Sequence, residues 1–171
     1  MHLPLPVAAG LITVVLGGLA AWFGVQASSL TSGPAAGNTA LADTATTSQL
    51  LGQVTTDVNA LFSYSYTDPG RSLAAARRDL TGAAVRQYRA LYQAVERDAA
   101  QHPQFVLTTA VTSAGVETID GTSARVLVFS NQVLTSSGQK PQSFDAMVAV
   151  NLIREGNTWK IAGIDTFSGG T

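Results

Sequence analysis

Residues 105–135 read FVLTTAVTSAGVETIDGTSARVLVFSNQVLT, and this stretch decides the fold class. Valine and threonine are frequent in it, and its apolar residues recur with a period of about two instead of the 3.6 of the preceding region. Asp120-Gly121 is a hairpin signal that divides the stretch into two strands, over residues 105–117 and 124–135. The sequence therefore predicts a long antiparallel hairpin.

Two more strands are predicted after this hairpin, beyond a loop at residues 136–142. In the third strand, residues 144–154, one face carries Phe144, Ala146, Val148, Val150 and Leu152. Gly156-Asn157 then turns the chain into a fourth strand, residues 158–166. Four strands joined by short turns predict a meander antiparallel sheet, and Gly115 marks an expected bend or bulge in its first strand.

A long helix is predicted to precede the sheet. Apolar residues recur at steps of three and four from Leu41 to Phe62, which places one apolar stripe along the helix. Gln53 and Asp57 lie on the other face, which we expect to contact water. Residues 64–67, YSYT, close this helix.

Two shorter helices are predicted between the long helix and the sheet. Asp68-Pro69 offers an N-cap followed by proline at the first helical position of a helix that ends at Asp79. Thr81 can cap the next helix, and the proline after His102 stops it. Helices followed by strands indicate a segregated α+β domain, with three helices packed on one face of a four-stranded antiparallel sheet.

Residues 7–25, VAAGLITVVLGGLAAWFGV, predict a single transmembrane helix with Val7 and Val25 at its ends. The segment has no charged side chain, and a helix of its length reaches roughly 28 Å, close to the hydrocarbon thickness of a bilayer. Its length and the aromatic pair Trp22-Phe23 favour a permanent anchor. The alternative is a signal peptide that is cleaved after Ala27.

Three regions follow from this prediction. Residues 1–27 form the membrane anchor, residues 28–36 form a short polar linker, and residues 37–171 form the α+β domain. With either reading of the first segment, the domain is expected outside the cytoplasm. We therefore expect a single-pass protein of the plasma membrane, with the lipid bilayer as one partner and the domain on the periplasmic side.

The composition excludes several classes of function. The formal net charge is −1 and the pI is about 6.0, so no basic surface is expected for nucleic-acid binding. The absence of cysteine excludes disulfides, thiolate metal sites and a cysteine nucleophile. No phosphate-binding loop, nucleophile motif or metal-ligand cluster occurs in the sequence, so we predict no cofactor, no metal and no catalytic residue.

The candidate site residues are polar or aromatic side chains near turns and strands. Tyr64 and Tyr66 lie by a turn and are the best candidates for a contact surface. Asn131 and Gln132 interrupt an apolar strand, where they can line a pocket or an assembly edge. The remaining large aromatic residues available to an apolar pocket are Tyr88, Tyr92, Phe129 and Trp159, of which we expect the last two to be core.

Three ionisable residues have simpler expected roles than catalysis. His102 is placed at a helix end, where capping is its usual role. Asp145 lies on the strand face opposite Phe144 and is expected to face solvent. Asp165 ends the last strand and is expected to pair with an arginine.

Short segments between residues 37 and 165 recur in one known family in this order and spacing. They are residues 37–43 (GNTALAD), 62–66 (FSYSY), 80–88 (LTGAAVRQY), 114–117 (AGVE), 124–129 (ARVLVF) with Gln132, and 159–161 (WKI) with Ile164-Asp165. Together with the preceding span they resemble the Mce-associated membrane proteins of actinobacteria.

This resemblance implies a fold and a function. The fold it implies is an extracytoplasmic, cone-like α+β domain with a curved sheet, similar to nuclear transport factors and to a scaffold subunit of type IV secretion. The function it implies is that of a non-enzymatic accessory subunit of an Mce-type lipid-import transporter, with transporter subunits or related anchored proteins as partners. The alternative is an envelope module that binds a lipid or sterol in the mouth of the cone.

Overall fold

The computed structural model describes residues 44–167, and there it confirms the predicted order of three helices followed by antiparallel strands. The elements are α2 (Thr44–Phe62), β1 (Tyr64–Ser65), α3 (Arg71–Asp79), α4 (Gly82–Gln101), β2 (Val106–Asp120), β3 (Ser123–Thr135), β4 (Gln142–Glu155) and β5 (Thr158–Asp165). Across residues 44–167 no helix has the length and hydropathy needed to cross a membrane. The predicted span at residues 7–25 and the linker at 28–36 lie outside the described residues.

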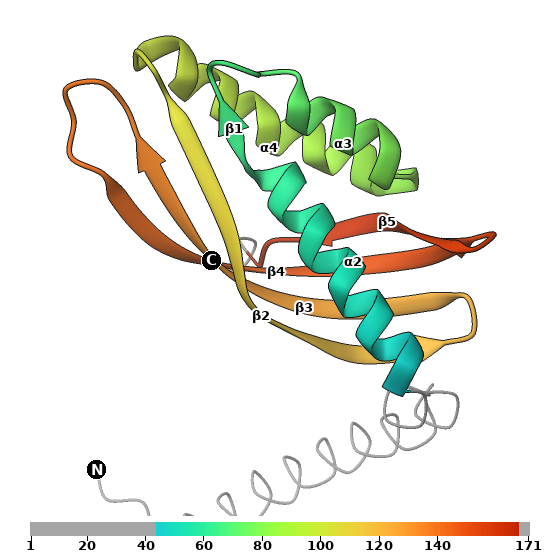
Figure 1. Ribbon diagram of the computed structural model, residues 1–171. Coiled ribbons are helices and arrows are strands. Elements are labelled where there is room, and N and C mark those ends of the chain that lie inside the picture. The colour runs from blue at the N-terminus through green and yellow to red at the C-terminus, as the bar shows by residue number, and fades with distance from the viewer. Residues whose placement is uncertain (1–43, 168–171) are drawn as a thin grey trace, which may run out of the picture. The chain divides into compact units, whose positions relative to one another are not determined.

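The sheet has five strands in the order β1-β2-β3-β4-β5, and each neighbouring pair is antiparallel (Figure 1). The prediction of four strands is therefore wrong. The missing strand is β1, in which Tyr64 pairs with Leu107 and Ser65 with Val106. Two residues are too few to produce a hydrophobic alternation, and their conformation is decided by the neighbouring strand.

The long hairpin of β2 and β3 is confirmed, but the position of its irregularities is not. Asp120 pairs with Ser123 across a two-residue turn, in which Gly121 has a φ of +52°, as this kind of hairpin requires. Gly115 pairs in register with Leu127, so the bulge expected there is wrong. The register instead shifts at Thr112 and at Glu117, and at each of these positions β2 has one residue more than β3.

The three helices cover one face of the sheet, and the core lies between the two layers (Figure 1). Each layer contributes buried side chains: Leu50, Val54, Val58 and Leu61 from α2, Ala84 and Tyr88 from α4, and Val126, Val128, Val150 and Leu152 from the sheet. The spacing of the α2 residues is the predicted helical stripe. On α4, Val85 is 42% exposed, whereas the neighbouring Ala84 is fully buried.

Neither α3 nor α4 begins with a side-chain capping hydrogen bond of the kind that the sequence predicts. The helix α3 begins at Arg71 with Gly70 as its N-cap, so the start predicted at Asp68-Pro69 is wrong. Those residues form a turn instead, in which the Arg71 N–H donates to the Asp68 carbonyl over 3.3 Å. Thr81 is the N-cap residue of α4 as expected, although its side chain makes no capping hydrogen bond.

Of the two aromatic residues that we expected in the core, only one is buried. Trp159 is 5% exposed, whereas Phe129 is 42% exposed. Along β3 the apolar residues occupy both faces, from Val126 to Phe129, so alternation alone does not say which face meets the helices. Val126 and Val128 face the helices, which places Phe129 on the outer face beside its cross-strand partner Met147.

Candidate functional site

A cavity of about 450 Å³ opens between the helical layer and the inner face of the sheet. Its walls are mostly apolar and aromatic. They include Val58, Leu61 and Phe62 of α2, Tyr88, Leu91, Tyr92 and Val95 of α4, Tyr64 of β1, and Leu107, Ser130, Gln132, Ala146 and Val148 of the sheet. An apolar cavity with few polar groups is typical of a site for a small ligand or for an inserted side chain.

The rings of Tyr64 from β1 and of Tyr88 and Tyr92 from α4 form a continuous aromatic part of the cavity wall. The rings of Tyr88 and Tyr92 are stacked with their centroids 5.8 Å apart, and Tyr64 lies 6.3 Å from Tyr92. Tyr64 in turn makes an edge contact with Phe105 at 5.7 Å. Ring pairs at these separations add stabilisation beyond the burial of their area, so this wall is fixed in place by its own contacts.

The tyrosine hydroxyls of this wall already have partners. The Tyr88 hydroxyl donates to the Leu61 carbonyl over 2.8 Å, and the Tyr92 hydroxyl donates to the Pro69 carbonyl over 2.8 Å. Burial raises the pKa of Tyr88 to about 12, and burial also raises the pKa of Tyr92. Both hydroxyls are therefore protonated donors near neutral pH, which tie α4 to the end of α2 and to the turn before α3, and neither can act there as a base.

We expect Tyr88→Phe to lower the free energy of unfolding by about 1 kcal/mol, because a buried hydrogen bond is lost and the Leu61 carbonyl loses this donor. The matched control is Tyr66→Phe, since Tyr66 is 47% exposed. The measurement is urea denaturation of both variants. Equal stabilities of the two variants would contradict this role of the Tyr88 hydroxyl.

The polar part of the cavity wall connects three elements. The Gln132 amide donates from Nε2 to the Thr109 hydroxyl over 3.0 Å, and that hydroxyl donates to the Phe62 carbonyl over 2.6 Å. This chain of hydrogen bonds joins β3 through β2 to the end of α2. Gln132 is therefore a wall residue with one of its groups engaged, in an otherwise apolar surface.

The four predicted contact residues do not form one site. Tyr64 and Gln132 line the cavity, whereas Tyr66 is exposed and lies outside it. Asn131 follows the strand alternation to the outer face, where its Nδ2 atom donates to Ser143 at 3.0 Å and to Asp145 at 3.1 Å. Adjacent residues on a strand face opposite ways, so Asn131 and Gln132 do not contribute to one site.

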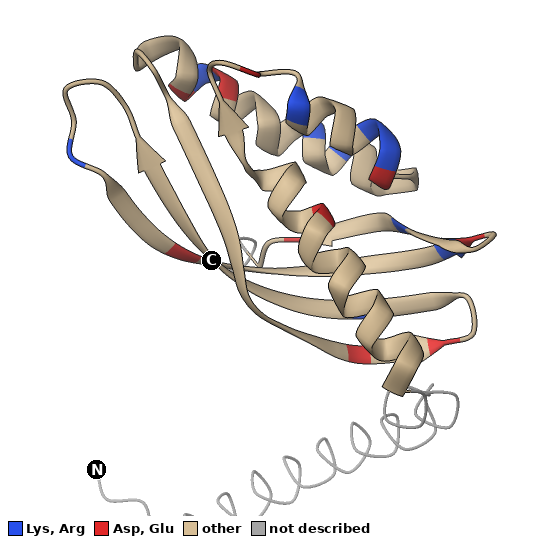
Figure 2. Cartoon of the chain, viewed as in Figure 1, with Lys and Arg blue, Asp and Glu red and all other residues tan. Residues whose placement is uncertain are grey.

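The outer face of the sheet carries a charged cluster around Arg125. Its guanidinium contacts Glu117 at 2.6 Å, Asn151 at 3.0 Å and Asp165 at 3.4 Å. The predicted pairing of Asp165 with an arginine is confirmed. Figure 2 shows that most charged positions lie on α3, α4 and the strand ends, so the middle of the sheet carries few charges.

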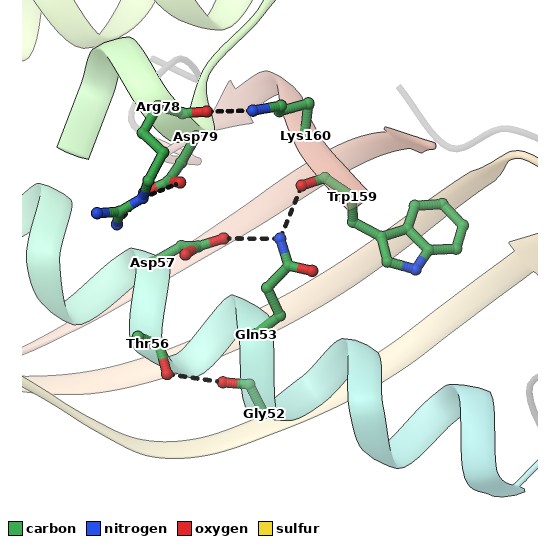
Figure 3. A network of polar contacts seen from close by, with 8 residues as sticks. All are labelled: Gly52, Gln53, Thr56, Asp57, Arg78, Asp79, Trp159 and Lys160. Atoms are coloured by element: carbon green, nitrogen blue, oxygen red, sulfur yellow. Dashed lines mark hydrogen bonds and ion pairs between the residues drawn. The ribbon is translucent and has the colours of Figure 1, made fainter. Parts of the chain in front are cut away.

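A second polar network joins α2, α3 and β5 (Figure 3), and none of its residues lines the cavity. Asp57 is 4% exposed, so the prediction that it faces water is wrong. Gln53 donates from Nε2 to the Trp159 carbonyl at 2.7 Å and to Asp57 at 3.3 Å. Burial, and secondly the nearby Asp79 carboxylate, raise the pKa of Asp57 to about 6.

Asp79 and Lys160 complete this network. The Arg78 guanidinium holds the buried Asp79 carboxylate with contacts of 2.7 and 2.6 Å, and the Lys160 ammonium donates to the Arg78 carbonyl. These contacts connect α3 to β5. Sequence patterns did not find this network because its members come from three elements that are far apart along the chain.

His102 has the capping role that we expected. It is the C-cap residue of α4, where its backbone N–H donates to the Asp98 carbonyl over 3.1 Å and its Nδ1 atom lies 2.9 Å from the same oxygen. It does not line the cavity. Among the residues that line the cavity, Asp145 is the one carboxylate, and it lies at the rim as an exposed residue.

Comparisons with known proteins add little to this geometry. No family model and no curated protein matches the chain. A solved structure that is similar to it is the intermembrane space region of the chloroplast protein ARC6, with 13% sequence identity and a TM-score of 0.47. That match covers 72% of this chain and 95% of the ARC6 chain. The cavity and its residues therefore carry the functional proposal.

Proposed function

We propose that this chain is a non-enzymatic accessory subunit of an Mce-type lipid-import transporter in the cell envelope. In this proposal residues 7–25 anchor it in the plasma membrane as a single-pass protein, and the α+β domain binds its partner on the periplasmic side. The sequence segments that resemble the Mce-associated family motivate the choice of transporter.

The observation that carries the binding role is the apolar cavity itself. Its tyrosine hydroxyls are engaged with backbone carbonyls, and its one carboxylate lies at an exposed rim. A proton-transfer enzyme needs an acid and a base that face one another inside an apolar pocket. A wall of engaged donors and aromatic rings is better suited to holding a partner or ligand than to moving a proton.

The test is crosslinking of the full-length protein in its native membrane, followed by purification and mass spectrometry of proteins and lipids together. Recovery of Mce transporter subunits in amounts that depend on the crosslinker is the expected result. Recovery of the protein without any transporter subunit, under conditions in which other membrane complexes stay intact, would contradict the accessory role.

A second candidate function is the binding of a lipid or sterol in the cavity, and the aromatic, mostly apolar lining favours it. We expect Ala146→Trp to fill the mouth and to weaken binding of a fluorescent fatty acid or sterol by about tenfold. Ala94→Trp, on an exposed position of α4 away from the cavity, is the matched control. Equal binding by both variants would exclude the cavity as the lipid site.

A further inference from the structure

One part of the sheet has an open edge. The pairing of β4 with β5 extends from Glu155 to Ala149, which lies opposite Asp165. The pairing of β4 with β3 continues beyond that point to Gln142. Over residues 142–148, β4 therefore has a described strand on one side only, and in Figure 1 it runs on past the end of β5.

The hydrogen-bond pattern fixes which backbone groups this edge presents. The Arg154 N–H donates to the Thr122 carbonyl over 2.7 Å, and the register of β3 with β4 contains no shift. In an antiparallel pair, alternate residues bond to the same neighbour, so the even-numbered residues of β4 bond to β3. The N–H and C=O groups of Ser143, Asp145 and Met147 are thus directed toward the open edge.

At several other positions along the edges of this sheet, side chains accept hydrogen bonds from backbone N–H groups of the strands. On β2, the Thr109 N–H donates to the Ser63 hydroxyl at 3.0 Å and the Val111 N–H donates to the Asn59 side chain at 2.8 Å. On β5, the Ile164 N–H donates to the Gln87 side chain at 2.8 Å. Proteins protect strand edges in this way against unwanted pairing. Within residues 44–167, no side chain accepts a hydrogen bond from the backbone N–H groups of Ser143, Asp145 and Met147 in this way.

The chain also ends its own strand at the point where it would otherwise continue along this edge. The Asp165 side chain accepts a hydrogen bond from the Phe167 N–H at 3.1 Å, which forms a turn directly after β5. Phe167 has a φ of +54°, a left-handed conformation that is unfavourable for a bulky residue. The turn therefore ends the strand conformation at residues 166–167, before β5 pairs with residues 142–148 of β4.

The open edge forms one rim of the cavity. Residues 145–148 line the cavity, although the side chains of Asp145 and Met147 belong to the outer face of the sheet. A strand that paired with this edge would place every second side chain on the inner face, over Ala146 and Val148. Backbone hydrogen bonds would then supply affinity, and the aromatic cavity would select apolar side chains.

We propose that the edge at residues 142–148 and the cavity together bind an extended segment of a partner protein as an added β-strand. The segment has apolar residues at alternate positions, and a basic residue beside Asp145, which is the one charged residue of the edge. This inference rests on the proposed function, because it specifies how the accessory domain holds its partner.

A second copy of the chain is a poorer occupant of the same edge. Antiparallel pairing of two copies that uses the N–H groups of Ser143, Asp145 and Met147 brings the two Asp145 carboxylates opposite or diagonal to each other. Like charges in these positions destabilise a strand pair. A basic residue at that position of a different protein segment has the complementary charge.

The test uses a displayed library of random peptides of about 12 residues, selected on the full-length protein in detergent. We expect enriched sequences to alternate apolar and other residues and to carry one basic residue. Asp145→Pro removes both the acid and the N–H group, whereas Asp145→Ala removes the acid alone. Because this N–H is not used by β3, proline is compatible with the folded edge.

We expect Asp145→Ala to weaken an enriched peptide a few-fold and Asp145→Pro to weaken it by at least about tenfold more. Equal affinities of the two variants would overturn strand addition. Where Asp145→Pro fails to fold, a charge exchange replaces it: Asp145→Lys is expected to lose the basic peptide and to bind the same peptide with glutamate at that position. Failure of the exchange, or a selection that returns no alternating peptide, would also overturn the proposal.

The outcomes for the two proposals are separable. If transporter subunits crosslink in the native membrane equally well to the wild type and to Asp145→Pro, the accessory role stands and strand addition at this edge is wrong. If alternating peptides bind as expected but no transporter subunit is recovered, the edge site stands and the Mce-type role is wrong. Dimerisation of the full-length protein that Asp145→Pro abolishes would identify a second copy as the occupant and overturn the proposed partner.

Discussion

Phe105→Ala is expected to lower the free energy of unfolding by about 3 to 5 kcal/mol, the usual cost of removing a buried phenylalanine. Phe105 is 2% exposed at the start of the sheet, and its ring contacts Tyr64 at 5.7 Å and lies 6.4 Å from His102. Its removal leaves an empty space beneath the end of α4 and also removes the support of Tyr64, which lines the cavity between the helices and the sheet. Chemical denaturation measures the loss.

Phe129→Ala is the matched control for this prediction. Phe129 is 42% exposed on the outer face, so the same change of side chain removes little buried area there. We expect a loss below about 1 kcal/mol. A loss at Phe129 as large as that at Phe105 would show that the outer face of the sheet is covered in the folded protein, contrary to the arrangement described above.

Asp57→Asn is expected to stabilise the protein near neutral pH and to remove a pH dependence of its stability. The folded state raises the pKa of Asp57 from 3.8 to about 6, first through burial and then through Asp79. The hydrogen bond from Gln53 and the charges of Arg78 and Lys160 oppose this rise only in part. An ionised Asp57 therefore costs stability, which an uncharged asparagine avoids.

The direction of the pH dependence follows from the raised pKa. Between about pH 4 and pH 6 the folded state keeps a proton on Asp57 that the unfolded state has lost. The contribution of Asp57 is thus fully present below about pH 4 and is lost as the pH rises through about 6. A rise of about two pKa units corresponds to at most about 3 kcal/mol.

Urea denaturation across this pH range measures the effect. The free energy of unfolding of the wild type is expected to fall as the pH rises from about 4 to about 6, because Asp57 ionises. Asp57→Asn is expected to lack this contribution to the pH dependence. Asp98→Asn, on an exposed position of α4, is the matched control and should keep the slope of the wild type. A lower free energy of unfolding for Asp57→Asn than for the wild type near neutral pH would contradict the claim that the ionised Asp57 carboxylate costs stability.

The sequence predicted the order of elements well because that order depends on local hydrophobic periods. The helical stripe from Leu50 to Leu61 and the valine- and threonine-rich runs of β2 and β3 are visible in the residues themselves. The strand β1 was missed because two residues carry no period, and the bulges at Thr112 and Glu117 were missed because they arise from the register with β3. Such features depend on a partner strand that local patterns do not contain.

The site was predictable only in part for a similar reason. Tyr64 and Gln132 were among the candidate contact residues, and they line one cavity because β1 and β3 both flank the same strand. Asn131 was expected with Gln132, but strand alternation places it on the outer face. The burial of Asp57 was missed because its neighbours Asp79 and Trp159 come from other elements. Tertiary packing decides these positions.

The central claim is that a partner is held at the open edge of β4 beside the cavity. The most direct measurement places a photo-crosslinking amino acid at Gln142 of the full-length protein in its native membrane, and in a second variant at the exposed Arg97 of α4 as control. We predict light-dependent crosslinks to a transporter subunit from position 142, and none to that subunit from position 97. Crosslinks from position 97 with none from position 142 would contradict the claim.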